Sequence, residues 1–200
     1  MTTAARRGEL HRRIRLLVWA TIGYNVIEAV IALTAGVRAS STALVGFGLD
    51  SVVEVAAAAA VAWQFAAADP ERREKAALRF IAWAFFALAG YITVDSVLAL
   101  SGSGEAEPSP VGIGLAAVSL AVMPLLAWLQ IRAGREIGSR SAVAEAKQTL
   151  LCSYLSAVLL VGLVLNALFG WTWADPIAAL VIAGFAVREG RQAWRGDPCC

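Results

Sequence analysis

Apolar and polar residues alternate along the chain in long blocks. Six windows of about 20 residues are predominantly apolar, and most charged residues gather in the short stretches between them. About 20 apolar residues in a helix are enough to cross the hydrocarbon core of a bilayer. Such segments must be helical, because a helix satisfies its own backbone polar groups where no water is present. The predicted spans are 16–36, 41–67, 76–100, 111–131, 146–169 and 173–193.

The composition agrees with an all-α membrane protein. Hydrophobic residues make up 59% of the chain and charged residues 16%, and the mean hydropathy is +0.68. Soluble domains average about 25% charged residues. We expect one transmembrane domain over 1–200, with a short basic segment at 1–15 and a short cytoplasmic tail at 194–200. The first span has no cleavage site near its end, so we expect it to be retained. Asp175 and Pro176 are expected to cap the start of the last span.

Lys and Arg predict the orientation in the membrane. Sixteen of the seventeen basic residues lie before the first span, between the second and third, between the fourth and fifth, or at the end of the sixth. Only Arg38 falls on the opposite side. Because cytoplasmic loops carry the excess of Lys and Arg, both termini are predicted to be cytoplasmic.

Two carboxylates interrupt the second span. Asp50 and Glu54 are four residues apart, which places both side chains on one helix face about 6 Å apart along the axis. Asp50 lies about 14 Å from the outer end of the span, near the bilayer centre. An intramembrane carboxylate costs roughly 2.5–3.5 kcal/mol on insertion scales. A single buried carboxyl could simply be protonated and hydrogen-bonded, but a pair on one face favours a cation or proton site.

Further acidic residues lie in the first and third spans. Glu28 is expected to line a pathway, together with Asn25 one turn away. Asp95 lies near the outer end of its span. For Asp95 a role in the pathway and simple exposure to outside water are equally compatible with the sequence.

The fifth span carries a polar stripe formed by Gln148, Thr149, Cys152 and Ser153. These side chains are candidate ligands opposite Asp50 and Glu54. The competing interpretation is that they hold neighbouring helices together by hydrogen bonds and close packing. Cys152 is also small enough to act only as an apolar filler.

Other residue types narrow the possible functions. His11, the only histidine, lies in the basic N-terminal segment, so no nucleophile–base arrangement is evident at membrane depth and an enzyme is not expected. The basic residues follow the topology and indicate no nucleic-acid partner. Cys199 and Cys200 are compatible with a soft metal, with lipidation or with two free thiols.

The order of these residues resembles the cation diffusion facilitator family of metal transporters. Asn25 and Glu28 precede Gly36, then Ser41-Thr-Ala-Leu44, and then Asp50-Ser-Val-Val-Glu54. Ala174-Asp175-Pro176 resembles the start of the sixth helix of that family. The resemblance implies six spans, both termini inside, a homodimer, and metal ligands at Asp50 and Glu54.

The chain also departs from the family pattern. Glu54 stands where the family has Asp, and the second His-x-x-x-Asp of the fifth helix falls on Thr149 and Ser153 by counting back from Trp173. The cytoplasmic domain that follows the sixth helix in the family is expected to be missing, since few residues follow the last span.

Two hypotheses follow from the sequence. The first is a divalent-cation/proton antiporter of the cell (inner) membrane that exports zinc, manganese or a similar cation by alternating access and has no other cofactor. The second is a non-transporting membrane scaffold derived from such a transporter. The carboxylate pair favours the first hypothesis, and the altered fifth helix favours the second.

Overall fold

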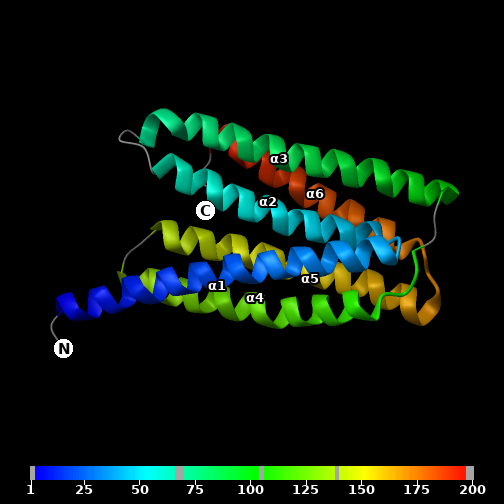
Figure 1. Cartoon of the computed structure of the whole chain (residues 1–200), viewed down its shortest axis with the longest axis horizontal. Coiled ribbons are helices and arrows are strands. Elements are labelled where there is room, and N and C mark those ends of the chain that lie inside the picture. The colour runs from blue at the N-terminus through cyan, green and yellow to red at the C-terminus, as the bar shows by residue number, and fades with distance from the viewer. Residues whose placement is uncertain (1–2, 66–69, 104–105, 138–139, 197–200) are drawn as a thin grey trace.

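The computed structural model describes residues 3–65, 70–103, 106–137 and 140–196, and all regular structure in these residues is helical (Figure 1). Side chains near some helix ends, including those of His11 and Gln148, lie outside the described part. So do Cys199 and Cys200. The elements are α1 (Thr3–Arg38), α2 (Thr42–Phe65), α3 (Pro70–Leu98), the π-helical turn η1 (Ala99–Ser103), α4 (Pro110–Ile137), α5 (Arg140–Phe169) and α6 (Ala174–Arg195).

The long helices run up and down along a common axis in two groups (Figure 1). One group contains α2, α3 and α6, and the other contains α1, α4 and α5. Contacts between α1 and α2 and between α5 and α6 join the groups, whereas α2 and α5 contact each other only over a short stretch. The helix α2 therefore packs against helices of both groups, which places its polar face inside the bundle.

In the part of the chain that the structure describes, five helices are long and apolar enough to cross a membrane. The qualifying stretches are Leu16–Arg38, Thr42–Ala60, Lys75–Gly102, Pro110–Ala133 and Thr149–Phe169. Among the described residues α6 does not qualify, because its last turns carry Arg188, Glu189 and Arg191. Five of the predicted spans thus have the length and apolar character that crossing a membrane requires, and a sixth span remains a prediction.

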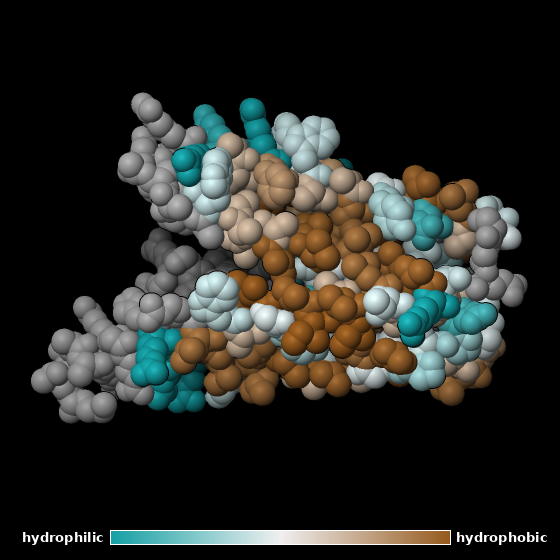
Figure 2. Space-filling model, viewed as in Figure 1, coloured by the Kyte–Doolittle hydropathy of each residue, from teal (hydrophilic) through white to brown (hydrophobic). Residues whose placement is uncertain are grey.

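The surface has the layout expected of a membrane protein. Large apolar side chains such as Trp19, Trp83 and Leu168 are exposed. Figure 2 shows a broad hydrophobic middle with hydrophilic patches toward the two ends of the bundle. The same view shows a hollow between the two groups of helices, toward the end at which α1 begins.

Small residues allow the helices to approach closely. A Cβ added at Gly36 of α1 would lie 2.8 Å from the backbone nitrogen of Val45 on α2. A Cβ added at Gly162 of α5 would lie 2.8 Å from the Cβ of Ala178 on α6. Small residues at helix contacts are the usual means of packing in membranes, where lipid tails remove the hydrophobic drive between helices.

Asp175 caps a different helix from the one expected. It lies in the first turn of α6, but no side chain caps that helix. Its carboxylate accepts hydrogen bonds from the Ser41 hydroxyl at 2.5 Å and from the backbone N–H of Ala43 at 3.2 Å. These donors belong to the start of α2, where backbone N–H groups without a partner inside the helix favour an anion. The expected cap on α6 is thus a buried link between α6 and α2.

Candidate metal centre

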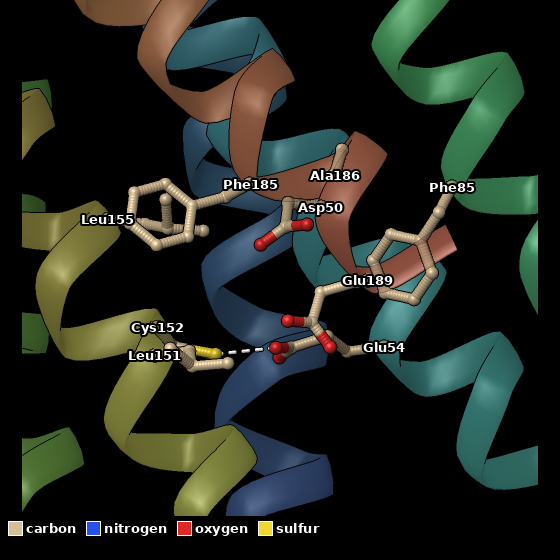
Figure 3. Close-up of a pocket in the computed structure, with 9 residues that line it drawn as sticks. All are labelled: Asp50, Glu54, Phe85, Leu151, Cys152, Leu155, Phe185, Ala186 and Glu189. Carbon is tan, nitrogen blue, oxygen red and sulfur yellow. Dashed lines mark hydrogen bonds between the residues drawn. The ribbon is translucent and has the colours of Figure 1, made fainter. Parts of the chain in front are cut away.

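Asp50 and Glu54 line a small cavity inside the helix bundle, together with Cys152 of α5 and Glu189 of α6 (Figure 3). Asp50 is buried and Glu54 is partly buried. The cavity has a volume of about 10 Å³, close to the minimum for one water molecule. The remaining lining residues are apolar: Phe85, Leu151, Leu155, Phe185 and Ala186.

Glu54 is held from two neighbouring helices. The Asn25 amide of α1 donates a hydrogen bond of 2.8 Å to Glu54 Oε2. The Cys152 thiol of α5 donates to Glu54 Oε1. Figure 3 shows the thiol and the carboxylate pointing toward each other. The carboxylate of Glu54 therefore joins the two groups of helices.

Glu28 belongs to a separate hydrogen-bonded network. Its carboxylate accepts from the Ser51 hydroxyl of α2 at 2.8 Å and from the Ser119 hydroxyl of α4. The Tyr24 hydroxyl lies 2.7 Å from Ser119 Oγ. Glu28 is buried but does not line the cavity of Asp50 and Glu54. The two predicted pathway residues of α1 thus differ. Asn25 contacts the cavity residue Glu54, whereas Glu28 binds the hydroxyl groups of Ser51 and Ser119.

Asp95 lies apart from the cavity. Its carboxylate accepts a hydrogen bond of 2.7 Å from the Thr42 hydroxyl, at the start of α2. It is half-buried and does not line the cavity. Asp95 is therefore placed at the end of the bundle where α1 connects to α2, not beside Asp50.

The polar residues of α5 differ in whether they line the cavity. Cys152 lines the cavity, while Thr149 and Ser153 are buried but do not line it. The Ser153 hydroxyl donates to the backbone carbonyl of Thr149 at 3.3 Å, within α5 itself. The side chain of Gln148 lies outside the described part of the structure.

Glu189 was not identified from the sequence. It falls inside the predicted span 173–193 but stands between Arg188 and Arg191, where charges are expected at the cytoplasmic end. The available signal was its spacing from Phe185 and Ala186, which places it on the same face of α6 as these cavity residues.

The cavity residues offer oxygen and sulfur ligands of mixed character. Among the described residues, no three His, Cys, Asp or Glu side chains form a group arranged to hold a metal ion. The acids and the thiol thus face a shared space without converging on one point (Figure 3). Carboxylates suit hard cations such as manganese and magnesium, and a thiolate adds preference for softer ions such as zinc.

Comparison with known proteins decides the family. Residues 18–195 match the cation efflux transmembrane domain. The chain belongs to the cation efflux family. Members of this family are cation transporters. This chain is accordingly a multi-pass integral membrane protein, and its family membership supports a role in cation transport.

Two curated relatives agree with membership of the cation efflux family. The magnetosome protein MamB of Magnetospira sp. is 28% identical over 203 residues, covering 95% of this chain and 67% of that protein. The uncharacterized transporter sll1263 of Synechocystis sp. is 28% identical over 188 residues, covering 84% of this chain and 58% of that protein. The chain thus spans about three fifths to two thirds of the length of these relatives.

Proposed function

We propose that this cation efflux protein carries a divalent cation across the membrane in exchange for protons, with the ion bound by Asp50, Glu54 and Cys152. The observation that supports this most directly is the cavity, where two carboxylates of α2 face a thiol of α5, all within helix stretches apolar enough to cross a membrane. These residues come from both groups of helices, so a bound ion would bridge the two groups.

The electrostatics of the cavity support a cation as the ligand. Asp50 and Glu54 are on one helix face, and Glu189 adds a third acid to the same apolar surroundings. Charged groups at membrane depth are costly unless they are paired, and intramembrane acids commonly mark ion and proton pathways. A divalent cation would neutralise two carboxylates. Protons and metal compete for the same oxygens, which is the chemical basis for exchange.

The ligand types favour zinc, cobalt, iron, cadmium or manganese over magnesium. Magnesium prefers oxygen ligands in octahedral geometry and keeps several waters. The cavity has room for about one water and includes the sulfur of Cys152. Thiolate ligands select softer metals than carboxylates do. The absence of histidine at membrane depth in the sequence distinguishes this ligand set from the usual tetrahedral zinc sites.

The arrangement of helices suits alternating access. Toward the end at which α1 begins, a hollow separates the two groups of helices (Figure 2). Toward the other end, α2 and α6 are joined through Ser41 and Asp175. We assign the hollow end to the cytoplasm, because the basic residues lie there. The protein then has six spans with both termini cytoplasmic. It exports its cation from the cytoplasm across the cell (inner) membrane.

The test is cation flux into proteoliposomes under an imposed pH gradient. Zinc, manganese, iron, cobalt, cadmium and magnesium are screened with wild-type protein, with the Asp50→Ala/Glu54→Ala variant and with Glu136→Gln. Glu136 is an exposed acid of α4 that pairs with Arg132, so its substitution leaves the cavity intact. We expect flux of at least one ion with wild type and Glu136→Gln, and at least a tenfold loss in the double variant.

Two results would contradict the proposal. Flux that persists in the double variant would move the site away from α2. No flux of any ion by folded wild-type protein would favour the scaffold hypothesis.

A further inference from the structure

Glu189 brings a third acid into the cavity from a helix that carries none of the other ligands. Its side chain extends from α6 toward Glu54 and so faces the side of α2 that bears Asp50 and Glu54 (Figure 3). Only 5% of Glu189 is exposed, although its neighbours in the chain include arginines. The acid is therefore directed into the bundle while the end of α6 carries the opposite charge.

One oxygen of Glu189 has no hydrogen-bond partner. In the described part of the chain, Oε1 of Glu189 is buried and accepts no hydrogen bond. Two other buried acids differ: Glu28 binds two serine hydroxyls, and Asp175 binds Ser41 and the Ala43 N–H. Buried polar atoms are nearly always paired, so an unpaired carboxylate oxygen needs a physical explanation such as a role in binding an ion.

The surroundings of Glu189 in the cavity are consistent with a cation: the adjacent Arg188 attracts its charge, but Oε1 receives no hydrogen bond from any described residue. Apolar side chains, including Phe85 and Phe185, line the same cavity and donate no hydrogen bond. The other acids of the lining, Asp50 and Glu54, repel an ionised Glu189 unless a cation or proton lies between them, and the Cys152 thiol donates to Glu54.

We propose that Glu189 is a third carboxylate ligand of the transported divalent cation. This inference rests on the proposed transport site at Asp50 and Glu54 and deepens it. A bound cation would draw the Glu189 carboxylate toward α2, and α2, α5 and α6 would then contribute ligands to one ion. The motif of the first two helices does not contain this acid, and its role follows from the packing of α6 against α2.

The test is direct binding of Cd²⁺ and Co²⁺ to the full chain in nanodiscs. Wild type, Glu189→Gln, Glu189→Asp, Asp50→Asn/Glu54→Gln and the surface control Glu136→Gln are titrated by calorimetry. We expect Glu189→Gln to weaken Cd²⁺ binding by at least about tenfold, as loss of groups around a metal does. Glu189→Asp should fall between wild type and Glu189→Gln, and Glu136→Gln should bind like wild type.

A second readout separates a ligand from a structural residue. Glu189→Gln should change the visible absorption bands of bound Co²⁺, which depend on the coordinating atoms, and should leave the thermal midpoint without added metal unchanged or higher. Wild-type affinity and spectrum in both Glu189 variants, alongside weak binding in the α2 variant, would overturn the role of Glu189 and leave the proposed function standing. No Cd²⁺ or Co²⁺ binding by folded wild-type protein would overturn both. Should Glu189→Gln fail to fold, Glu189→Asp decides by the same two readouts.

Discussion

At the scale of single residues, Asn25 is the clearest case of a side chain that acts through another. Its amide donates to Glu54 Oε2 at 2.8 Å and fixes the direction of that carboxylate. Asn25 is itself buried, so no water replaces the bond easily. A group that orients a ligand contributes to metal affinity without touching the metal.

We therefore expect Asn25→Ala to weaken cation binding by about 10–100-fold. Glu54 would remain present but would lose the donor that orients it. The measurement is a calorimetric titration with Cd²⁺, using Thr34→Ala as control, because the Thr34 hydroxyl bonds to backbone carbonyls of α1. Equal affinity in Asn25→Ala and Thr34→Ala would show that the amide does not position the ligand.

The sequence predicted some site residues better than others for reasons that are visible at this scale. Asp50 and Glu54 stand out because charges are rare in apolar segments. The choice between Cys152 and Ser153 depends on the rotation of α5, and one residue along a helix turns the side chain by about 100°. Only the packed structure fixes that rotation. Glu189 was hidden because its neighbours Arg188 and Arg191 resemble an ordinary solvated helix end.

At the scale of elements, the close approach of α1 and α2 depends on Gly36. A methyl group there would lie 2.8 Å from the backbone nitrogen of Val45 and 3.2 Å from the backbone carbon of Leu44. Backbone atoms cannot rotate away as a side chain can. Gly23, on the same helix, has no atom within 4 Å of the place that a methyl group would occupy, and it serves as a matched comparison.

We expect Gly36→Ala to destabilise the protein by about 1–3 kcal/mol through overpacking. Gly23→Ala should be neutral or stabilising by up to about 1 kcal/mol, because Ala is the better helix former. Thermal unfolding in one detergent, followed by tryptophan fluorescence, provides the comparison. A midpoint for Gly36→Ala at or above that of Gly23→Ala would contradict the close packing of α1 on α2.

The helices were predictable in number and approximate place, but their ends were not. The hydrophobic blocks located each helix, since apolar length is what the membrane requires. Yet α1 begins at Thr3 and α5 at Arg140, well before their apolar portions. A helix can continue beyond its apolar portion into water, because its backbone hydrogen bonds do not depend on apolar side chains, so hydropathy does not mark where it stops. The role of Asp175 was missed because its partners, Ser41 and Ala43, are far away in the sequence.

At the scale of the whole molecule, the basic residues predict one orientation for every connection. The orientation can be tested by introducing one accessible cysteine at a time and measuring which side of the membrane it is labelled from. The background is Cys199→Ser/Cys200→Ser, in which the remaining Cys152 is buried. We expect Ser101→Cys to react with a membrane-impermeant maleimide in intact cells. Arg135→Cys should react only after the membrane is opened, since basic segments face the cytoplasm. Both positions are exposed in the structure.

Labelling of both cysteines from the same side would contradict the alternating topology of α3 and α4. The reversed pattern would place the termini outside, and the direction of transport would have to be reassigned. The paired design also controls for expression, because each variant is compared before and after permeabilisation of the same cells.

The short connection between α1 and α2 has a consequence for engineering the protein. Ser41 binds Asp175 and also accepts the Leu44 N–H at 3.1 Å, while the Ala39 carbonyl accepts the Glu107 N–H at 2.8 Å. These hydrogen bonds link the end of α1, the start of α2, the start of α6 and the segment before α4, and we call this set of links the α1–α2 corner. An epitope tag, fluorescent domain or antibody-binding insert placed between Ala39 and Thr42 would break that corner, although hydropathy alone would choose this turn as a convenient insertion point. Exposed Ser101 and Gly102 have fewer such ties, so that turn is the better place for a fusion used in imaging or particle alignment.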